Sequence, residues 1–331
     1  MRSIFLNVCL FTIWATCLKA ADRDTIIVAQ DGSGKYTSVQ KALEAVKDSE
    51  SSILTIFIKP GVYKEQLRLK SSEKHVKLIG EDANKTILTY DNFASKTNPE
   101  TGNNYGTTGS SSFFVEADHV TAENLTFANS AGPVGQAVAV NITGNRVAFK
   151  NCRFLGFQDT LYTKGPQDDK SKESLQYYEN CYIEGTVDFI FGAATALFVN
   201  CELHSKGQGG YVTAASTPEH KKYGYVFIDC KLTGESSEAS VALGRPWRPY
   251  AQVVYINCDM GDHIIPQGWN NWGKEENEST VFYAEYNSKG KGANKNKRVK
   301  WAKTLNGEEA KLYTKEQVLG DWLPFIIPTS I

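Results

Sequence analysis

The chain lacks the sequence features of most common enzyme and binding classes. After residue 20, no apolar run is long enough to cross a bilayer, so a membrane-embedded protein is not expected. Acidic and basic residues nearly cancel, with a formal net charge of −1, which leaves little field to attract nucleic acid. No cysteine pair has zinc-binding spacing and no glycine-rich phosphate loop is present, so no metal or organic cofactor is expected. A Gly-x-Ser-x-Gly motif is also missing, which argues against a serine esterase.

The one long apolar region is at the start of the chain. Arg2 precedes an apolar stretch over residues 4–18, and Lys19-Ala20-Ala21 follows it. This order is typical of a signal peptide over residues 1–20, although Leu18 is a mediocre residue for a cut after Ala20. We therefore expect a secreted, extracellular protein whose residues 21–331 form a single domain.

A short motif recurs through the middle of the chain. Its members begin with Asn or Asp, continue with Cys and any residue, and end with an apolar residue, at Asn151, Asn180, Asn200, Asp229 and Asn257. A degenerate sixth copy begins at Asn124 and has Leu in place of Cys. Short runs of alternating apolar and polar residues lie between the copies, separated by turn residues. The repeat predicts an all-β parallel β-helix, a solenoid that buries one side of every strand. A β-sandwich with accidental Asn-Cys pairs explains six copies in phase less well.

Each position of the motif has an expected place in a coil. The Asn belongs at a bend, because its side chain can bond neighbouring backbone and it tolerates left-handed conformations. The Cys then points inward as a small apolar filler. Cys181 and Cys201 are 20 residues apart, so they could lie on neighbouring coils and form a disulfide. Five cysteines follow the signal peptide, and an odd number leaves at least one thiol free.

The ends of the chain differ from the repeats. Residues 25–30 and 53–58 have strand patterns, and residues 36–47 have an amphipathic helical pattern. We interpret them as a cap that covers the open end of the solenoid. From about residue 274 the repeat is lost, and the chain closes with residues 315–322 and an apolar tail, which we expect to pack on the β-helix.

Two aspartates share one phase of the repeat. Asp159 and Asp188 each follow a motif cysteine, Cys152 or Cys181, by seven residues. If each repeat is one coil, the two carboxyls lie one above the other and cannot both ionise cheaply. One would stay protonated as an acid, and the other would be an anion able to act as nucleophile or base. Arg245 is the candidate cation to orient the ionised member through a forked pair of hydrogen bonds.

Two glutamines extend this candidate site. Gln136 and Gln158 are 22 residues apart, about one coil, so their amides could bond an oxygen that gains charge in a transition state. Each residue also has a structural alternative, since turn aspartates, glutamine ladders and Arg-Pro-Trp corners are common packing features. Their convergence favours a catalytic interpretation.

At these residues the sequence resembles the pectinesterases, also called pectin methylesterases. The resemblance extends from about Asp24 to Trp322. Five spaced motifs carry it, namely Gly61-Val62-Tyr63-Lys64-Glu65, Gln136-Ala137-Val138-Ala139, Gly156-Phe157-Gln158-Asp159-Thr160-Leu161, Gly185-Thr186-Val187-Asp188-Phe189-Ile190-Phe191-Gly192 and Leu243-Gly244-Arg245-Pro246-Trp247.

The resemblance implies a right-handed parallel β-helix that hydrolyses methyl esters of galacturonate units in methyl-esterified homogalacturonan (pectin) and releases methanol. It implies that Asp188 is the nucleophile and Asp159 the acid and then base. Gln136 and Gln158 would form the oxyanion site, and Arg245 would hold Asp188. The aromatic residues implied in the sugar groove are Trp247, Trp269 and Phe189. The mechanism requires no cofactor, and we expect a monomer.

Two departures from the family pattern concern specificity. About eight extra residues fall in a charged segment, 165–174, which should project beside the groove, and Gly290-Lys291-Gly292 stands where relatives often have Gly-Pro-Gly. Four Asn-x-Ser/Thr sites, at Asn84, Asn124, Asn141 and Asn277, are compatible with glycosylation. The alternatives are a β-helical pectate lyase or galacturonan hydrolase, and a catalytically silent carbohydrate-binding β-helix, since a fold does not determine a reaction.

Overall fold

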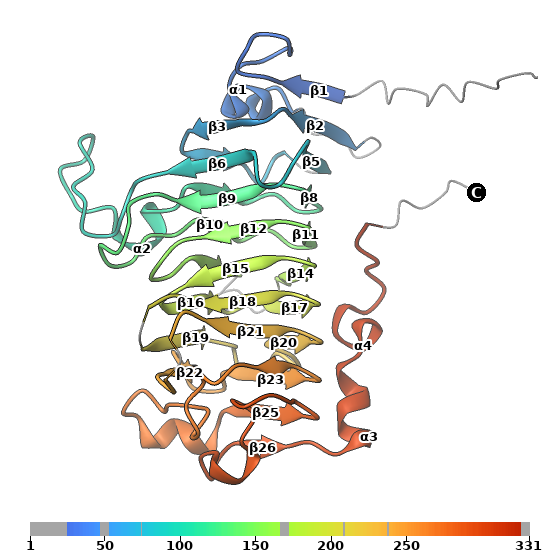
Figure 1. Cartoon of the computed structure of the whole chain (residues 1–331). Helices are drawn as coiled ribbons and strands as arrows, with labels where there is room; N and C mark the ends of the chain where they lie inside the picture. Colours follow the sequence, from blue (N-terminus) through green and yellow to red (C-terminus); the bar gives the residue numbers. More distant parts are fainter. Residues whose placement is uncertain are drawn as a thin grey trace, which may run out of the picture.

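The computed structural model describes residues 25–46, 53–73, 75–165, 172–207, 209–236 and 238–325. The predicted signal peptide and most of the predicted 165–174 loop lie outside these residues. Figure 1 shows the described chain as one column of stacked coils. Strands pair in parallel with the equivalent strands of neighbouring coils, as in the pairs β11 with β14 and β14 with β17. The parallel β-helix predicted from the repeat is confirmed.

Three sheets run the length of the column. Sheet A has 11 strands, in the order β1 (Thr25–Val28), β2 (Leu54–Ile58), β5 (Val76–Gly80), β8 (Thr121–Glu123), β11 (Val147–Lys150), β14 (Leu175–Glu179), β17 (Thr195–Val199), β20 (Tyr225–Ile228), β23 (Gln252–Ile256), β25 (Phe282–Tyr286) and β26 (Lys303–Thr304). Sheet B has eight, β3 (Gly61–Lys64), β6 (Thr86–Tyr90), β9 (Thr126–Asn129), β12 (Arg153–Leu155), β15 (Tyr182–Gly185), β18 (Glu202–Ser205), β21 (Lys231–Gly234) and β24 (Asp259–Met260). Sheet C has seven, β4 (Leu67–Leu69), β7 (Phe113–Val115), β10 (Val140–Ile142), β13 (Leu161–Thr163), β16 (Val187–Gly192), β19 (Gly210–Ala215) and β22 (Val241–Pro246).

The repeated Asn or Asp forms the corner between sheets A and B. All six predicted members have a left-handed backbone, with φ between 52° and 56°, and Asn287 extends the series with φ 49°. Side-chain amides of neighbouring coils bond one another on either side of Asp229, for example from Asn200 Nδ2 to Asn180 Oδ1 at 2.7 Å and from Asn287 Nδ2 to Asn257 Oδ1 at 2.9 Å. We call these residues the asparagine column. Its conformation is the one predicted for the motif.

The motif cysteines follow the asparagine column and point into the core. All five are buried and all five are free thiols. The disulfide considered for Cys181 and Cys201 is therefore absent. The Cys181 Sγ lies 3.6 Å from the Phe149 carbonyl oxygen and the Cys201 Sγ 3.5 Å from that of Tyr178. Each sulfur thus contacts backbone of the preceding coil, consistent with the small apolar filler that we predicted.

Aromatic rings fill the centre of the column beneath sheet A. Phe149, Tyr178, Phe198, Phe227 and Tyr255 come from successive coils, and their ring centroids are 5.2, 4.4, 4.5 and 4.6 Å apart in that order. These separations match the spacing of neighbouring strands. Stacking between these five coils helps to hold them in register.

The ends of the column are closed as expected, and the N-terminal helix is shorter than the predicted 36–47 segment. Helix α1 (Val39–Glu44) buries Val39, Ala42 and Leu43 against the first coils, and the Ser38 side chain caps its N-terminus. At the other end, the chain turns back along the outside of sheet A (Figure 1). Within this tail, α4 (Lys315–Leu319) packs Val318 and Leu319 on residues of sheet A. The remaining helices are α2 (Gly106–Gly109), α3 (Gly307–Ala310), η1 (Glu275–Ser279), η2 (Lys295–Lys297) and η3 (Lys311–Tyr313).

Two of the four sites compatible with glycosylation are unsuitable in the folded chain. Asn141 and Asn277 are only 3% and 2% exposed, so a glycan on either side chain would have to displace packed neighbours. Asn124 is a member of the asparagine column, and Asn84 is exposed. Within the part of the chain that the structure describes, no helix is long and apolar enough to cross a membrane.

Candidate active site

Asp159 and Asp188 lie on neighbouring coils at the outer face of sheet C. Strands β13 and β16 pair with Leu161 opposite Ile190, so the two aspartates, each two residues earlier, occupy equivalent positions. The Asp159 amide also donates to the Val187 carbonyl at 3.0 Å. The predicted stacking of the two residues is therefore confirmed.

Both aspartates have a left-handed backbone, with φ 65° at Asp159 and 53° at Asp188. At Asp188 the pairing of β16 with β19 also shifts register, between Val187 and Ile190. A bulge of this kind re-aims side chains locally. Asp188 consequently faces outward, whereas Phe189 and Ile190 enter the core.

The two carboxyls are strongly desolvated and carry different partners. Asp159 is 6% exposed and Asp188 is 5% exposed. Burial and, secondarily, the nearby Asp188 charge raise the pKa of Asp159 to about 8. Burial also raises the pKa of Asp188, but hydrogen bonds from Arg245 and its charge oppose that rise. This environment favours a protonated Asp159 beside an ionised Asp188 at neutral pH.

Arg245 holds Asp188 through a two-pronged ion pair. Its Nε donates to Oδ1 at 2.9 Å and its Nη2 donates to Oδ2 at 2.7 Å. The guanidinium carbon also lies 3.9 Å from the Tyr211 ring centroid and 3.6 Å from that of Trp272. The fork fixes the carboxylate plane, and the rings restrict the guanidinium in turn.

Gln136 and Gln158 lie side by side shortly before β10 and β13, where their backbones form a parallel bridge. The Ala137 amide donates to the Gln158 carbonyl at 3.1 Å. Both glutamines line the same cavity as Asp159 and Asp188, so the structure brings together all five residues predicted to be catalytic.

This cavity has a volume of about 560 Å³ and opens on the outer face of sheet C. We call it the main cavity. Its lining combines the five residues above with aromatic, hydroxyl and cationic side chains. The further members are Tyr105, Gly106, Thr107, Thr108, Tyr162, Lys164, Phe191, Ala214, Trp247 and Trp272.

Two aromatic residues expected in the groove lie elsewhere. Phe189 is fully buried in the core, because the left-handed turn and bulge at Asp188 direct it inward. Trp269 is 2% exposed and packs between Tyr255 and Tyr283. Residues 268–270 continue sheet C beside Gly244, which turns the Trp269 ring toward the core. Of the three predicted residues, only Trp247 lines the main cavity.

Other aromatic residues line the main cavity in their place, and each lies three residues after a residue that the sequence predicted for the site. Tyr162 and Phe191 each follow one of the aspartates by three residues, and their rings stack at 4.1 Å between centroids. Trp272 follows Trp269 by three residues and has a left-handed backbone of φ 62°. The shared phase of Tyr162 and Phe191 was a usable signal, whereas the turn that exposes Trp272 was not evident.

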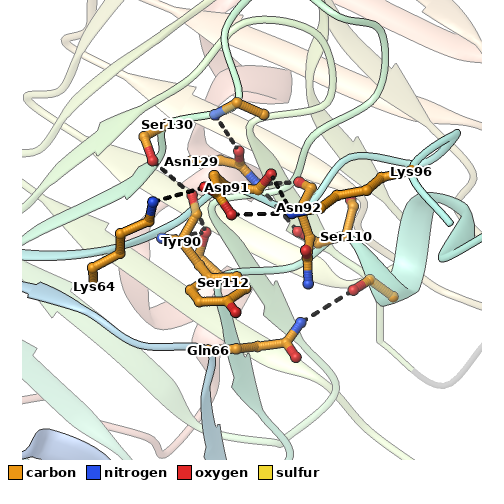
Figure 2. Close-up of polar contacts among 12 residues, drawn as sticks. Lys64, Gln66, Tyr90, Asp91, Asn92, Lys96, Ser110, Ser112, Asn129 and Ser130 are labelled. Carbon is orange, nitrogen blue, oxygen red and sulfur yellow. Dashed lines mark hydrogen bonds and ion pairs between the residues drawn. The ribbon is translucent and has the colours of Figure 1, made fainter. Parts of the chain in front are cut away.

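A polar network anchors the loop that forms one wall of the main cavity. Figure 2 shows Asn129 directed at the backbone of this loop, residues 91–112, and Asp91 between Lys64 and Lys96. The buried Asn129 Nδ2 lies within hydrogen-bonding distance of the Asn92, Ser110 and Val138 carbonyl oxygens, at 2.9, 3.1 and 3.1 Å. The network thereby holds the α2 segment, with Thr107 and Thr108, against the cavity.

The same loop also reaches the glutamine pair. The Ala94 amide donates to the Gln136 carbonyl at 2.8 Å, and the Gly106 amide donates to the Ala94 carbonyl at 2.9 Å. Gln66 Nε2 donates to the carbonyls of Gly109 and Ser111 at 3.2 and 3.0 Å. Loop position and glutamine position are therefore coupled, a relation that the sequence did not reveal.

Comparison with known proteins agrees with this fold and shows the family of the chain. The family model described as Pectinesterase matches residues 25–321. Pectinesterase 31 of Arabidopsis thaliana is 40% identical over 287 residues, which cover 86% of this chain and 88% of the relative. The pectin methylesterase from carrot superposes with a TM-score of 0.82 at 30% identity, covering 90% of this chain and 94% of that chain.

A further solved structure, of a pectin methylesterase in complex with a hexasaccharide, superposes with a TM-score of 0.78 at 31% identity, covering 91% of this chain and 98% of that chain. The fold of these neighbours agrees with a right-handed parallel β-helix. The family-model match over residues 25–321 includes the paired aspartates, Arg245 and the two glutamines. By sequence and by structure, the chain belongs to the pectinesterase family of carboxylic ester hydrolases.

Proposed function

We propose that this protein removes methyl esters from galacturonate units of pectin, with Asp188 as nucleophile and Asp159 as acid and base. The observation that carries the proposal is the asymmetric carboxyl pair. Arg245 holds one member as an anion, and burial raises the pKa of the other to about 8. An acyl transfer at neutral pH needs one group of each kind.

The first half of the reaction is acyl transfer to the protein. An Asp188 oxygen attacks the ester carbonyl carbon, and the carbonyl oxygen becomes an anion in the tetrahedral intermediate. The side-chain amides of Gln136 and Gln158 would donate hydrogen bonds to that oxygen. Asp159 gives its proton to the methoxy oxygen, the C–O bond breaks, and methanol leaves an anhydride between Asp188 and the galacturonate.

The second half regenerates the site. Asp159, now an anion, takes a proton from water, and the hydroxyl oxygen attacks the galacturonate carbonyl of the anhydride. Collapse of this intermediate returns Asp188 as a carboxylate and releases a galacturonate carboxyl. Arg245 keeps the Asp188 oxygens in place through both halves, and burial of the pair prevents water from screening its charges.

The polymer would lie along the main cavity against its aromatic side chains. Tyr162, Phe191, Trp247 and Trp272 present ring surfaces that suit the apolar faces of sugars. Pectin is also the substrate to which the family name points, and the predicted signal peptide fits an enzyme that meets this polymer outside the cell.

The test is methanol release from highly methylated pectin by the purified protein, with ultraviolet absorbance recorded for unsaturated chain ends. We expect methanol without an absorbance rise. Asp188→Ala should lower the rate by more than about 10³-fold. A rise in absorbance without methanol would instead establish a lyase, and no signal in either channel would favour a carbohydrate-binding β-helix.

A further inference from the structure

A second cavity lies where the chain turns from sheet C into sheet A. Its volume is about 500 Å³, and no residue that lines it also lines the main cavity. One wall comes from the turn and includes His75, His119 and Arg146, and the other comes from residues 321–325 of the C-terminal tail. We call it the corner cavity. It is separate from the reaction site of the proposed function.

The three basic residues of the turn occupy equivalent positions on successive coils. Strand β5 pairs Lys77 with Thr121 of β8, and Thr121 pairs in turn with Ala148 of β11. Each basic residue lies two positions before one of these strand residues and has a left-handed backbone, with φ of 60°, 58° and 58°. The rings of His75 and His119 stack, with centroids 4.8 Å apart. Two imidazoles and a guanidinium therefore form a row along one wall of the corner cavity.

The guanidinium of this row is only weakly engaged within the fold. Arg146 Nη2 donates to Asp321 Oδ1 at 3.2 Å, which is the one side-chain hydrogen bond of Arg146 to the residues that the structure describes. The Arg146 side chain is 34% exposed and that of Asp321 is 88% exposed, so solvent screens the pair. A guanidinium has five N–H donors. Arg146 can therefore bind an incoming carboxylate, for which Asp321 is the competing anion.

The wall from the C-terminal tail supplies an aromatic surface. Trp322 and Phe325 are half-buried and pack against the apolar cluster on sheet A that contains Tyr177 and Leu197, which holds this part of the tail in place. A flat aromatic ring suits the apolar face of a sugar. A guanidinium suits a carboxylate, which it can bind through two parallel hydrogen bonds. The two walls together fit a ligand that has both groups, which is a uronate.

We infer that the corner cavity binds a galacturonate unit whose carboxylate is free, with Arg146 contacting the carboxylate in place of Asp321 and Trp322 contacting the sugar ring. This inference rests on the proposed function and adds a second, non-catalytic contact with the same polymer. A polymer held at the corner cavity stays close to the enzyme, which raises the effective concentration of its other stretches at the main cavity. Stretches that are already de-esterified would thus retain the enzyme on a partly processed polymer.

Nuclear magnetic resonance of the tryptophan indole N–H groups tests binding at the corner cavity itself. A short unesterified oligogalacturonate is titrated into the purified protein at low ionic strength. The Trp322 signal, assigned with Trp322→Phe, reports the corner cavity, and the Trp247 and Trp272 signals report the main cavity. We expect the Trp322 signal to shift and to saturate. Arg146→Gln should raise the half-saturating concentration about fivefold, and Asp321→Asn should lower it about twofold because the competing anion is gone.

A second exposed ion pair provides matched controls. Lys291 Nζ lies 3.3 Å from Asp262 Oδ2, and neither residue lines the corner cavity. Lys291→Gln and Asp262→Asn remove the same charges as the two test variants and should leave the half-saturating concentration at Trp322 unchanged. Asp321→Asn also keeps the test decisive if Arg146→Gln disturbs the tail, because it predicts tighter rather than weaker binding.

Each outcome separates the inference from the proposed function. A Trp322 signal that stays fixed while the Trp247 and Trp272 signals shift would overturn the inference and leave the proposed function standing. An equal Trp322 shift with acetate at the same carboxylate concentration, or with a fully methylated oligomer, would overturn the assignment to a uronate. The same holds for a half-saturating concentration that neither Arg146→Gln nor Asp321→Asn changes. A protein that shows the Trp322 shift but releases no methanol would refute the proposed function and leave the corner cavity established as a uronate site.

Discussion

Two columns of residues with a left-handed backbone run along the same coils. One pairs its polar side chains by hydrogen bonds, and the other buries two carboxyls side by side. In the asparagine column, amides from successive coils bond one another at the edge between sheets A and B, as Asn200 does with Asn180 at 2.7 Å. On sheet C, Asp159 and Asp188 have the same backbone conformation, with φ 65° and 53°, but bury two carboxyls side by side. We call this pair the aspartate column.

The difference shows how one backbone device serves two purposes. A left-handed residue lets the chain turn sharply and presents a side chain at the edge of the coil. Where that side chain is a partly exposed amide, donors and acceptors alternate along the column and stabilise the stack. Where it is a buried carboxyl, burial and, secondarily, the neighbouring carboxylate disfavour ionisation, which raises the pKa of Asp159. The asparagine column thus contributes to stability, and the aspartate column provides the reactive carboxyls.

The largest effect is expected when a carboxyl of the aspartate column is exchanged for an amide. Asp159→Asn should lower methanol release by about 10²- to 10⁴-fold, because an amide cannot supply or accept the transferred proton. Asp229→Asn makes the same exchange in the asparagine column and should leave the rate unchanged. Comparable loss in both variants would show that the effect is structural rather than chemical.

Next in size is the fork between Arg245 and Asp188. Arg245→Lys retains the charge but cannot donate in two parallel directions, so we expect kcat to fall about 10²-fold. Arg245→Gln should fall further, because it also removes the charge. A fully active Arg245→Lys variant, measured by methanol release, would rule out a need for the two-pronged geometry.

The aspartate column should also give the protein a pH-dependent stability. The pKa of Asp159 is raised to about 8 in the fold, while an unfolded aspartate has a pKa near 3.8. Between these values the native state holds a proton that the unfolded state lacks, so stability decreases as pH rises to about 8 and then levels off. Asp159→Asn should lose this dependence, on the order of 1 kcal/mol per pH unit, in denaturant titrations at pH 5 and pH 8. Identical slopes for both proteins would contradict the raised pKa.

The loop that forms one wall of the main cavity, residues 91–112, is anchored by Asn129. Asn129→Ala would leave three buried carbonyls, of Asn92, Ser110 and Val138, without its amide. We expect KM for pectin to rise about tenfold with a smaller change in kcat, since the loop loses its anchor while the carboxyl pair is intact. Ser130→Ala is the control and should change KM less, because the exposed Ser130 hydroxyl makes one hydrogen bond, to the Tyr90 carbonyl at 3.1 Å. A KM unchanged by Asn129→Ala would show that the loop holds without this residue.

The smallest effect concerns one member of the asparagine column. Asn180→Ala should lower the free energy of unfolding by about 1–2 kcal/mol, because it removes amide bonds and places a Cβ residue at φ 54° without compensation. Asn180→Gly should recover about 1 kcal/mol of this loss, since glycine adopts positive φ freely. Methanol release should be unaffected in both. If Asn180→Ala and Asn180→Gly lower the free energy of unfolding equally, the left-handed backbone conformation is not what Asn180 stabilises.

Much of the site was predictable because the repeat is local and periodic. The distance from each cysteine to its aspartate sets the phase of Asp159 and Asp188, and one coil separates Gln136 from Gln158. The resemblance to pectinesterases added the roles expected for these residues. Side-chain direction beyond the repeat was less accessible. Phe189 and Trp269 were expected in the groove but face the core, while Phe191 and Trp272 line the cavity.

The sequence by itself determined the coil, because alternating strands and left-handed corner residues are properties of neighbouring positions in the chain. Those local rules were sufficient to stack two carboxyls and to bury a column of thiols. Only the tertiary structure decided how deeply the carboxyls are desolvated and that Cys181 and Cys201 stay unlinked. It also decided that the 91–112 loop reaches Gln136. Burial, pKa and the approach of distant segments depend on how every coil packs on the next, so no local pattern encodes them.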